Sequence, residues 1–362
     1  GHSYERESIE QWFALGKDTS PKTGAPLPHT RLIPNHDLRK SIEEWRETHV
    51  RLIPRSALTL DSTPITAGSS KRVFRGTLAV PGAPRPITVA VLEMRGQGTV
   101  DTEARTFIRL GRHPRLVKLY GQCVEGSNQL LVVEFAERRS LADAFDDLAD
   151  EDGVSSITQA HRLVILQQIC SAMENLAHEG VIHRDLAARN VLLFGFDPRD
   201  VSVTSVKVTD FGLSVGSYGR THATVAGDAL PTRYLPPESL QKRRFSEKSD
   251  VWAFGVTAWE VYTDGDVPFF EITSDDAVVT HVIAGGRLSR PEGCPEAVWS
   301  VISSCWAQRP SDRPTFAQLA AALGSCSPPP GAEEGEEQPH GGLLPEALQP
   351  AALAAIPNAE AS

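Results

Sequence analysis

The sequence predicts an α+β fold in which a small β-rich lobe precedes a larger α-helical lobe. Strand-like runs of β-branched and apolar residues come first, at residues 88–92 and 129–133. A long helical pattern at residues 159–177 follows them, and helical runs dominate the chain beyond it. Because the strands precede the helices along the chain, we expect them to form two successive lobes within residues 58–323.

Residues 1–50 form a separate segment that reads as helix, loop and helix. Apolar side chains recur with helical spacing over residues 4–15 and again over residues 35–45. Between them, residues 20–28 are rich in Pro and Gly, which favours a loop. The sequence therefore predicts a small helical module ahead of the two lobes.

Two further segments complete the domain organisation. Residues 51–57 are predicted to be a linker between the helical module and the lobes. Residues 324–362 carry six acidic residues but no Lys, Arg or aromatic residue. Such a composition buries too little apolar surface to offset the ordering entropy, so we expect a disordered acidic tail rich in Pro, Gly and Ala.

Composition limits the classes of function. The 362 residues are 40% hydrophobic and 23% charged, as in ordinary globular proteins, and the net charge is −10. This charge argues against nucleic acid or an anionic membrane as a general partner. The five widely spaced Cys residues favour reduced thiols, so we expect a cytoplasmic protein. The first residue is Gly, so the chain is expected to begin within a longer protein.

The most informative residues lie between positions 181 and 212. Asp185 and Asn190 stand five residues apart behind the apolar run that begins at Val181. Asp210 follows twenty residues after Asn190 and is succeeded by Phe and Gly. Asp185 is thus a potential general base, and Asn190 and Asp210 carry oxygen donors that suit a hard cation.

These motifs resemble the catalytic loop and the magnesium-binding motif of protein kinases. The resemblance covers residues 58–323 and implies a bilobal protein kinase fold, ATP and Mg²⁺ as cofactors, and proteins as substrates. It implies that Asp185 is the catalytic base and that Asn190 and Asp210 bind magnesium. It also implies a buried ion pair between Arg313 and Glu238, which would be architectural.

Within the superfamily, the catalytic loop looks most like tyrosine kinases and tyrosine-kinase-like proteins. Ala187 occupies the position where serine/threonine kinases generally carry Lys, and a cation stands instead at Arg189. A tyrosine acceptor is therefore favoured, with serine or threonine left open. Arg184 resembles the arginine that pairs with a phosphorylated activation segment, and Tyr218 is a candidate phosphorylation site.

The sequence departs from the kinase pattern at two points. Leu92 replaces the strand lysine that normally pairs with the phosphates, which deprives Glu103, the helix carboxylate, of its usual partner. The glycine-rich loop retains only Gly68, and Lys71 occupies the position of its last glycine. This combination resembles the with-no-lysine kinases, so Lys71 is a candidate replacement. The alternative is that Lys71 is a solvated loop cation.

The rest of the nucleotide site follows from the same resemblance. Three apolar side chains would sandwich the adenine, namely those of Val73, Ala90 and Leu192. The backbone of Glu134 and Ala136 would hydrogen-bond the edge of the base.

Residues 1–50 resemble the second half of a U-box, which gives the predicted fold a partial U-box ahead of the kinase domain. U-boxes hold a ubiquitin-conjugating enzyme through two loops and a helix. By this resemblance Trp12 and Pro28 would line the groove for that enzyme, although packing in the core is the alternative role for Trp12.

Three functions remain open at this point. The first is an active protein kinase, favoured by Asp185, Asn190 and Asp210. The second is a pseudokinase scaffold, favoured by Leu92. The third is a ubiquitin ligase that uses the kinase-like domain to recruit substrates.

Overall fold

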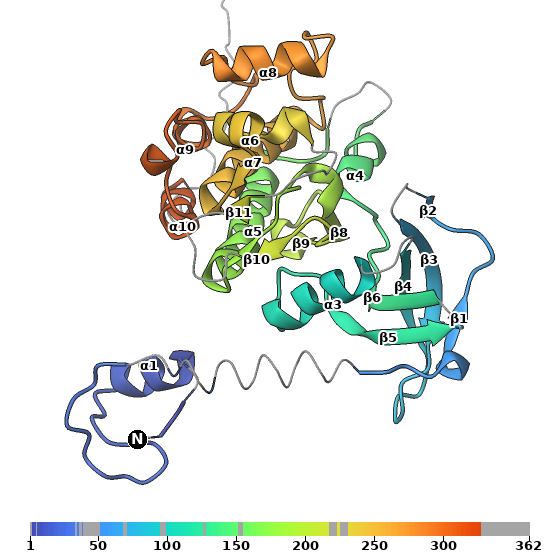
Figure 1. Cartoon of the computed structure of the whole chain (residues 1–362), viewed down its shortest axis with the longest axis vertical. Helices are drawn as coiled ribbons and strands as arrows, with labels where there is room; N and C mark the ends of the chain where they lie inside the picture. Colours follow the sequence, from blue (N-terminus) through green and yellow to red (C-terminus); the bar gives the residue numbers. More distant parts are fainter. Residues whose placement is uncertain are drawn as a thin grey trace, which may run out of the picture. The chain divides into compact units, whose positions relative to one another are not determined.

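The computed structural model contains a β-rich lobe, a helical lobe and part of the N-terminal segment (Figure 1). Most of the predicted second helix and the whole predicted tail beyond residue 326 lie outside the described residues. The structure describes residues 2–4, 6–32, 35, 38, 51–67, 71–94, 99–125, 128–150, 155–216, 223–224 and 231–326.

Within the described residues, the small lobe is a six-stranded antiparallel sheet with the order β1-β3-β4-β6-β5, and β2 pairs beside β3. The helix α3 (Thr99–Leu110) packs against β5 and β6. Both predicted strands are confirmed, since they lie in β4 and β6. The strands are β1 (Leu58–Leu60), β2 (Thr66–Ala67), β3 (Lys71–Leu78), β4 (Ile87–Met94), β5 (Leu119–Glu125) and β6 (Asn128–Glu134).

The segment predicted as a linker is attached to this sheet. The N–H of Ile53 donates to the carbonyl of Gln122 at 2.8 Å, and the N–H of Gln122 donates to the carbonyl of Arg51 at 2.9 Å. A side chain at Gly121 would collide with that Arg51 carbonyl, so glycine is required for the close approach. Ile53 is buried among apolar residues of the sheet. Residues 51–57, which end in the turn η1 (Arg55–Ala57), therefore extend the small lobe.

The larger lobe is organised around α7 (Glu247–Tyr262), which is buried from Ser249 to Tyr262. The predicted helix at residues 159–177 is confirmed as α5 (Gln159–His178), which begins with a capping box at Thr158. The other helices are α4 (Leu141–Asp147), α6 (Pro237–Lys242), α8 (Asp275–Ile283), α9 (Glu296–Ser304) and α10 (Phe316–Ser325).

The larger lobe also contains short strands and 3₁₀ turns. The strands pair as β7 with β10, β8 with β9 and β11 with β12. Their bounds are β7 (Val181–Ile182), β8 (Val191–Gly195), β9 (Ser205–Val208), β10 (Val215–Gly216), β11 (Ala223–Thr224) and β12 (Arg244–Phe245). The 3₁₀ turns are η2 (Ala188–Asn190), η3 (Val201–Val203), η4 (Thr232–Tyr234) and η5 (Pro310–Asp312).

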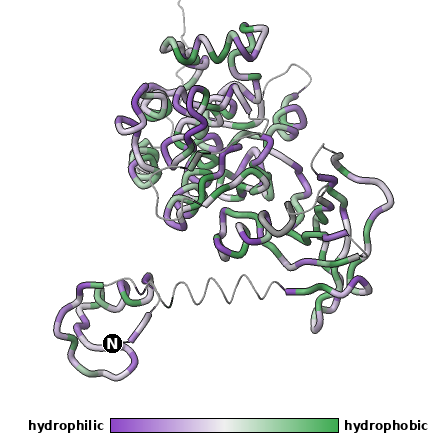
Figure 2. The backbone as a smooth tube through the Cα atoms, in the orientation of Figure 1, coloured by the Kyte–Doolittle hydropathy of each residue, from purple (hydrophilic) through white to green (hydrophobic). Residues whose placement is uncertain are grey.

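One buried apolar cluster spans both lobes. It includes Leu92 and Val133 of the sheet, Phe107 of α3 and Phe211 beside Asp210. Figure 2 shows hydrophobic positions gathered in the interior of the helical lobe and hydrophilic positions on its outer turns. Among the described residues, no helix is both long and apolar enough to cross a membrane.

Candidate active site

The catalytic loop between β7 and β8 is anchored by a carboxylate of α7. Asp250 accepts hydrogen bonds from the backbone N–H of His183 at 2.8 Å and of Arg184 at 3.0 Å. Burial raises the pKa of Asp250 to about 6, and the two N–H donors and the nearby His183 oppose this rise. Because these hydrogen bonds tie the loop backbone to the buried helix α7, the side chains of the residues that follow are held in place.

Asp185 is held by two other residues of the same loop. The side-chain amide of Asn190 donates to Oδ2 of Asp185 at 2.9 Å and to its carbonyl at 2.7 Å. The guanidinium of Arg189 pairs with Oδ1 of Asp185. The Asn190 amide nitrogen is engaged in this way, so the side-chain oxygen is the atom of Asn190 that could bind a metal ion. Asp185 itself is partly exposed.

Lys71, the first residue of β3, reaches from the small lobe to the larger one. Its ammonium nitrogen lies 2.7 Å from Oδ1 of Asp210 and 3.9 Å from Oε1 of Glu103. The Glu103 side chain is fully buried, whereas that of Lys71 is 19% exposed. The alternative interpretation of Lys71 as a solvated loop cation is therefore wrong. Instead, Lys71 partners the carboxylate that Leu92 leaves without a lysine.

Charge and burial compete at these three side chains. Burial lowers the pKa of Lys71, but the carboxylates of Glu103 and Asp210 outweigh it and the net pKa is raised. For Asp210, burial raises the pKa, but Lys71 outweighs it and the net pKa is lowered. Burial raises the pKa of Glu103 to about 7, and Lys71 offsets only part of this rise. The cluster therefore keeps the lysine and Asp210 charged.

The register of the sheet explains why Lys71 lies close to position 92. Val73 pairs with Leu92 and Lys71 pairs with Met94, so Lys71 and Leu92 are diagonal neighbours on one face of the sheet. Side chains of diagonal neighbours are within reach of a long, flexible lysine. Arg72 points to the opposite face, where it pairs with Glu93.

Asp210 is further positioned by the residue after it. Asp210 has a positive φ of 65°, which is uncommon for a residue other than glycine. The ring of Phe211 packs edge-on against Phe107 of α3, with centroids 4.9 Å apart, and against His183, with centroids 5.6 Å apart. This packing holds the Asp210 carboxylate next to Lys71.

The expected adenine residues are brought together with their apolar neighbours. Ala90 belongs to the cluster that spans both lobes, and Val73 and Leu192 pack against it. The N–H of Glu134 donates to the carbonyl of Lys118 at 2.9 Å, and its carboxylate binds the ammonium of Lys207 at 2.7 Å. Only the carbonyl of Glu134 thus remains for a base.

Two residues of the expected site are not described, namely Gly68 and Tyr218. Arg184 is described and buried; its guanidinium donates to the carbonyl of Leu213 at 2.8 Å and lies over the ring of Phe245. The architectural ion pair is confirmed, since Arg313 forms two hydrogen bonds with Glu238, of 2.7 Å and 2.9 Å.

Glu260 of α7 is a further residue of the site, which was not predicted from the sequence. One oxygen of Glu260 accepts from the N–H of Ala188 at 2.9 Å, and the other accepts from the hydroxyl of Tyr234 at 2.7 Å. The ring of Tyr234 lies 5.0 Å from the guanidinium carbon of Arg189. Glu260 thus links the catalytic loop to Tyr234 of η4. A lone acidic residue within the apolar run 251–262 is the signal that could have revealed it.

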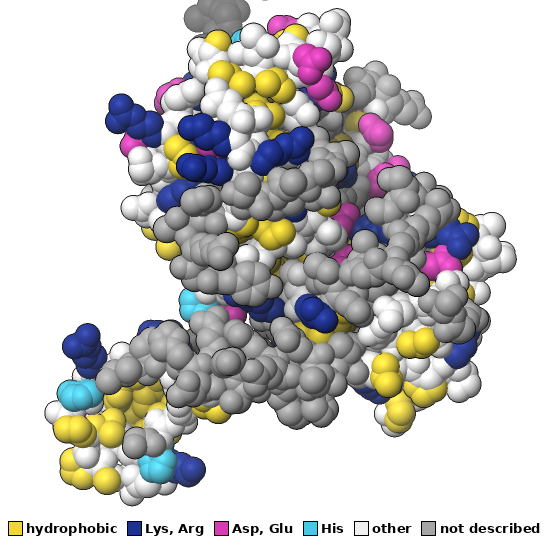
Figure 3. Space-filling view, in the orientation of Figure 1, with side chains coloured by type: hydrophobic (Ala, Val, Ile, Leu, Met, Phe, Trp, Pro, Cys, Tyr) yellow, Lys and Arg dark blue, Asp and Glu magenta, His cyan; other side chains and the backbone are white. Residues whose placement is uncertain are grey.

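The N-terminal segment folds around α1 (Arg6–Ala14), shorter than the predicted 4–15. Trp12 is half-buried, and its indole N–H donates to the carbonyl of Thr19 at 2.8 Å. Pro28 is exposed, and Leu15 is 72% exposed. Figure 3 shows hydrophobic side chains gathered on one face of this segment.

Comparison with known proteins gives matches over both parts of the chain. The family model described as "Protein tyrosine and serine/threonine kinase" matches residues 61–323, and that described as "U-box domain" matches residues 1–51. The chain is 38% identical over 221 residues to "Tyrosine-protein kinase TXK" of Homo sapiens, covering 61% of this chain and 39% of that protein.

Two other relatives differ in what their names say. "Ephrin type-A receptor 8" of Rattus norvegicus is 37% identical over 267 residues, which cover 72% of this chain and 68% of that protein. "Inactive tyrosine-protein kinase 7" of Gallus gallus is 34% identical over 225 residues, which cover 61% of this chain and 21% of that protein. The chain thus spans about two fifths of the human relative's length. It belongs to the protein tyrosine and serine/threonine kinase family and carries a U-box domain at its N-terminus.

Proposed function

We propose that this chain is an active protein kinase that transfers the γ-phosphate of ATP to tyrosine hydroxyls of proteins. The observation that carries the proposal is the placement of the Lys71 ammonium between Asp210 and Glu103. A positive charge is needed where the phosphates bind, because the transferred group carries several negative charges. Lys71 supplies that charge although Leu92 does not.

Asp185 acts as the base in this proposal. Its carboxylate accepts the hydrogen of the substrate hydroxyl while that oxygen attacks the γ-phosphate. Arg189 and Asn190 fix the orientation of the carboxylate through the contacts described above. The proton therefore moves from the substrate hydroxyl to an oxygen of Asp185 as the phosphoryl group leaves ADP.

The donor atoms suit magnesium and a nucleotide. Asp210 offers a carboxylate and Asn190 an amide oxygen, which are the hard ligands that Mg²⁺ prefers. These two residues would hold the metal, which would supply positive charge to neutralise the phosphates. Ala136 is buried, and its N–H makes no hydrogen bond with the described residues, so it can donate to the adenine edge.

The choice of tyrosine is supported by the loop beside the base. Ala187 is small and buried, and Arg189 lies between the carboxylate of Asp185 and the ring of Tyr234. One of the relatives described above is named as a tyrosine-protein kinase, and another is named as an inactive one. The proposal also includes regulation, in which Tyr218 is phosphorylated and the guanidinium of Arg184 pairs with that phosphate.

A ubiquitin ligase is the second candidate, favoured by the U-box match and by the exposed Leu15 near Trp12. Trp12 and Pro28 would contact the ubiquitin-conjugating enzyme. Ubiquitin chains formed with a conjugating enzyme by the wild type but not by Trp12→Ala would support it.

The kinase proposal is tested with Mg²⁺, labelled ATP and two peptide libraries, one with Tyr and one with Ser and Thr as acceptors. We expect transfer to the Tyr library, reduced by about 100-fold or more in Asp185→Asn. Asp61→Asn changes an exposed Asp outside the site and should leave transfer unchanged. ATP binding by the wild type without any transfer would establish a pseudokinase. Phosphoryl transfer only to the Ser and Thr library would contradict the proposal that tyrosine is the acceptor.

A further inference from the structure

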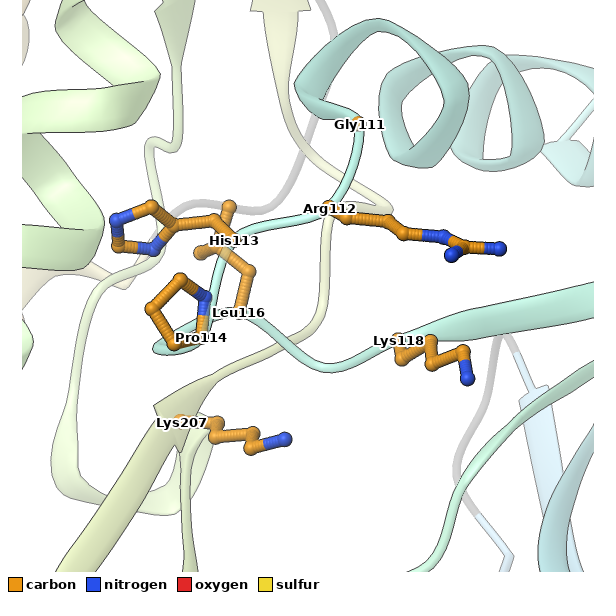
Figure 4. A pocket seen from close by; sticks show the side chains of 7 residues that line it. All are labelled: Gly111, Arg112, His113, Pro114, Leu116, Lys118 and Lys207. Carbon is orange, nitrogen blue, oxygen red and sulfur yellow. The ribbon is translucent and has the colours of Figure 1, made fainter. Parts of the chain in front are cut away.

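A pocket of about 310 Å³ lies away from the catalytic side chains. Two segments form it: the loop of residues 111–118 between α3 and β5, and β9 of the larger lobe. None of Lys71, Asp185 or Asp210 lines this pocket. Its lining residues are Gly111, Arg112, His113, Pro114, Leu116, Lys118 and Lys207 (Figure 4).

The pocket carries an excess of positive charge in an acidic protein. The side chains of Arg112 and Lys118 come from the loop before β5 and that of Lys207 from β9, and all three extend in the same direction in Figure 4. Among the described residues, no carboxylate forms an ion pair with Arg112 or Lys118, whereas Glu134 pairs with Lys207. Three cations thus face one carboxylate, which favours a ligand with more than one negative charge.

Part of the remaining wall, beside Gly111 and His113, is apolar. The buried side chain of Leu116 and the ring of Pro114 lie beside the three cations. A ligand that fills the pocket must therefore combine an apolar body with a dianionic head. A small inorganic anion would leave the apolar wall uncovered. The volume of about 310 Å³ lies at the lower end of the range for small-molecule sites, which suits a single side chain.

We propose that this pocket binds the phosphotyrosyl side chain of a protein. The aryl ring would cover Leu116 and Pro114, while the phosphate, with its three acceptor oxygens, would accept from Arg112, Lys118 and Lys207. Binding does not depend on phosphoryl transfer by this chain. A chain that fails as a kinase therefore still binds if the proposal is right.

Phenyl phosphate titrated into the whole chain by calorimetry tests the proposal. We expect a Kd at or below about 1 mM, and weaker binding as salt screens the cations. Arg112→Gln combined with Lys118→Gln should weaken binding by about tenfold or more, because both positive charges face the phosphate. These residues are exposed and lack ion pairs in the described structure, so the fold should persist.

Matched controls separate this pocket from other sites. Arg85→Gln combined with Lys242→Gln removes the same charge from exposed positions elsewhere and should leave the Kd unchanged. Lys71→Ala should also leave it unchanged, because Lys71 does not line the pocket. Inorganic phosphate that binds as tightly as phenyl phosphate would overturn the aryl assignment. Absence of phenyl phosphate binding, or equal binding by the Arg112 and Lys118 variant, would overturn the site.

Discussion

The ammonium nitrogen of Lys71 lies 2.7 Å from Oδ1 of Asp210, so a side chain of the sheet holds a carboxylate of the helical lobe. The same ammonium stands 3.9 Å from the buried carboxylate of Glu103. The ammonium of Lys71 thus lies close to two carboxylates, one from α3 and one from the loop after β9. The arrangement keeps a cation in the site although Leu92 is apolar and buried.

The pKa of Glu103 predicts a pH-dependent stability. Burial raises this pKa from 4.5 to about 7, so the folded protein binds the proton more tightly than the unfolded chain. The contribution to stability is complete below the unfolded pKa and is lost as the pH rises through about 7. Between about pH 5 and pH 8.5, wild type should lose up to roughly 3 kcal/mol relative to Glu103→Gln. Urea unfolding of both proteins at both pH values measures the free energy of unfolding. An equal change with pH in wild type and Glu103→Gln would contradict the prediction.

The ion pair between Arg313 and Glu238 should matter far more to stability than a surface pair. Arg313 has a fully buried side chain, so Glu238→Gln leaves its charge unpaired and should cost about 3–5 kcal/mol. Glu296 is 78% exposed and pairs with Arg290. Glu296→Gln removes the same chemical group and should cost less than about 1 kcal/mol. Urea unfolding compares the two variants, and similar costs would refute the account.

Two helical glycines should respond to Ala in opposite directions. A Cβ at Gly255 would lie 2.6 Å from the indole nitrogen of Trp306 and 2.8 Å from Cβ of Cys305. The buried α7 cannot shift freely, so Gly255→Ala should destabilise the fold by about 1–3 kcal/mol. Gly324 has no such neighbour, and Gly324→Ala should stabilise α10 by about 0.5–1 kcal/mol. Thermal melts of both variants give the signs; stabilisation by Gly255→Ala would show that the packing is wrong.

Much of the fold could be predicted from local patterns. The helix at residues 159–177 could be predicted because its apolar spacing is a local property of the sequence. The strands at residues 88–92 and 129–133 were visible for the same reason. The anchoring of residues 51–57 was not, because Ile53 is buried by pairing with a strand far along the chain.

The residues of the site also divide into those that local motifs predict and those that depend on contacts distant in sequence. Asp185, Asn190 and Asp210 stand in motifs whose spacing is readable, so they could be named from the sequence. The environment of Lys71 depends on the register between β3 and β4, which no local pattern reveals. Glu260 was not predicted, because its hydrogen-bond partners Ala188 and Tyr234 are distant in sequence.

The most direct test of the account is the kcat/KM of Lys71→Met for a peptide substrate at saturating Mg²⁺. We expect a loss of about 100-fold to 1,000-fold, because a positioned charge at the phosphates is removed. Adding Leu92→Lys should recover part of the loss, since residue 92 is the diagonal neighbour. Arg72→Met removes a cation from the opposite face and should change kcat/KM by less than about threefold. Wild-type turnover by Lys71→Met, with none by Asp185→Asn, would contradict the central role of Lys71.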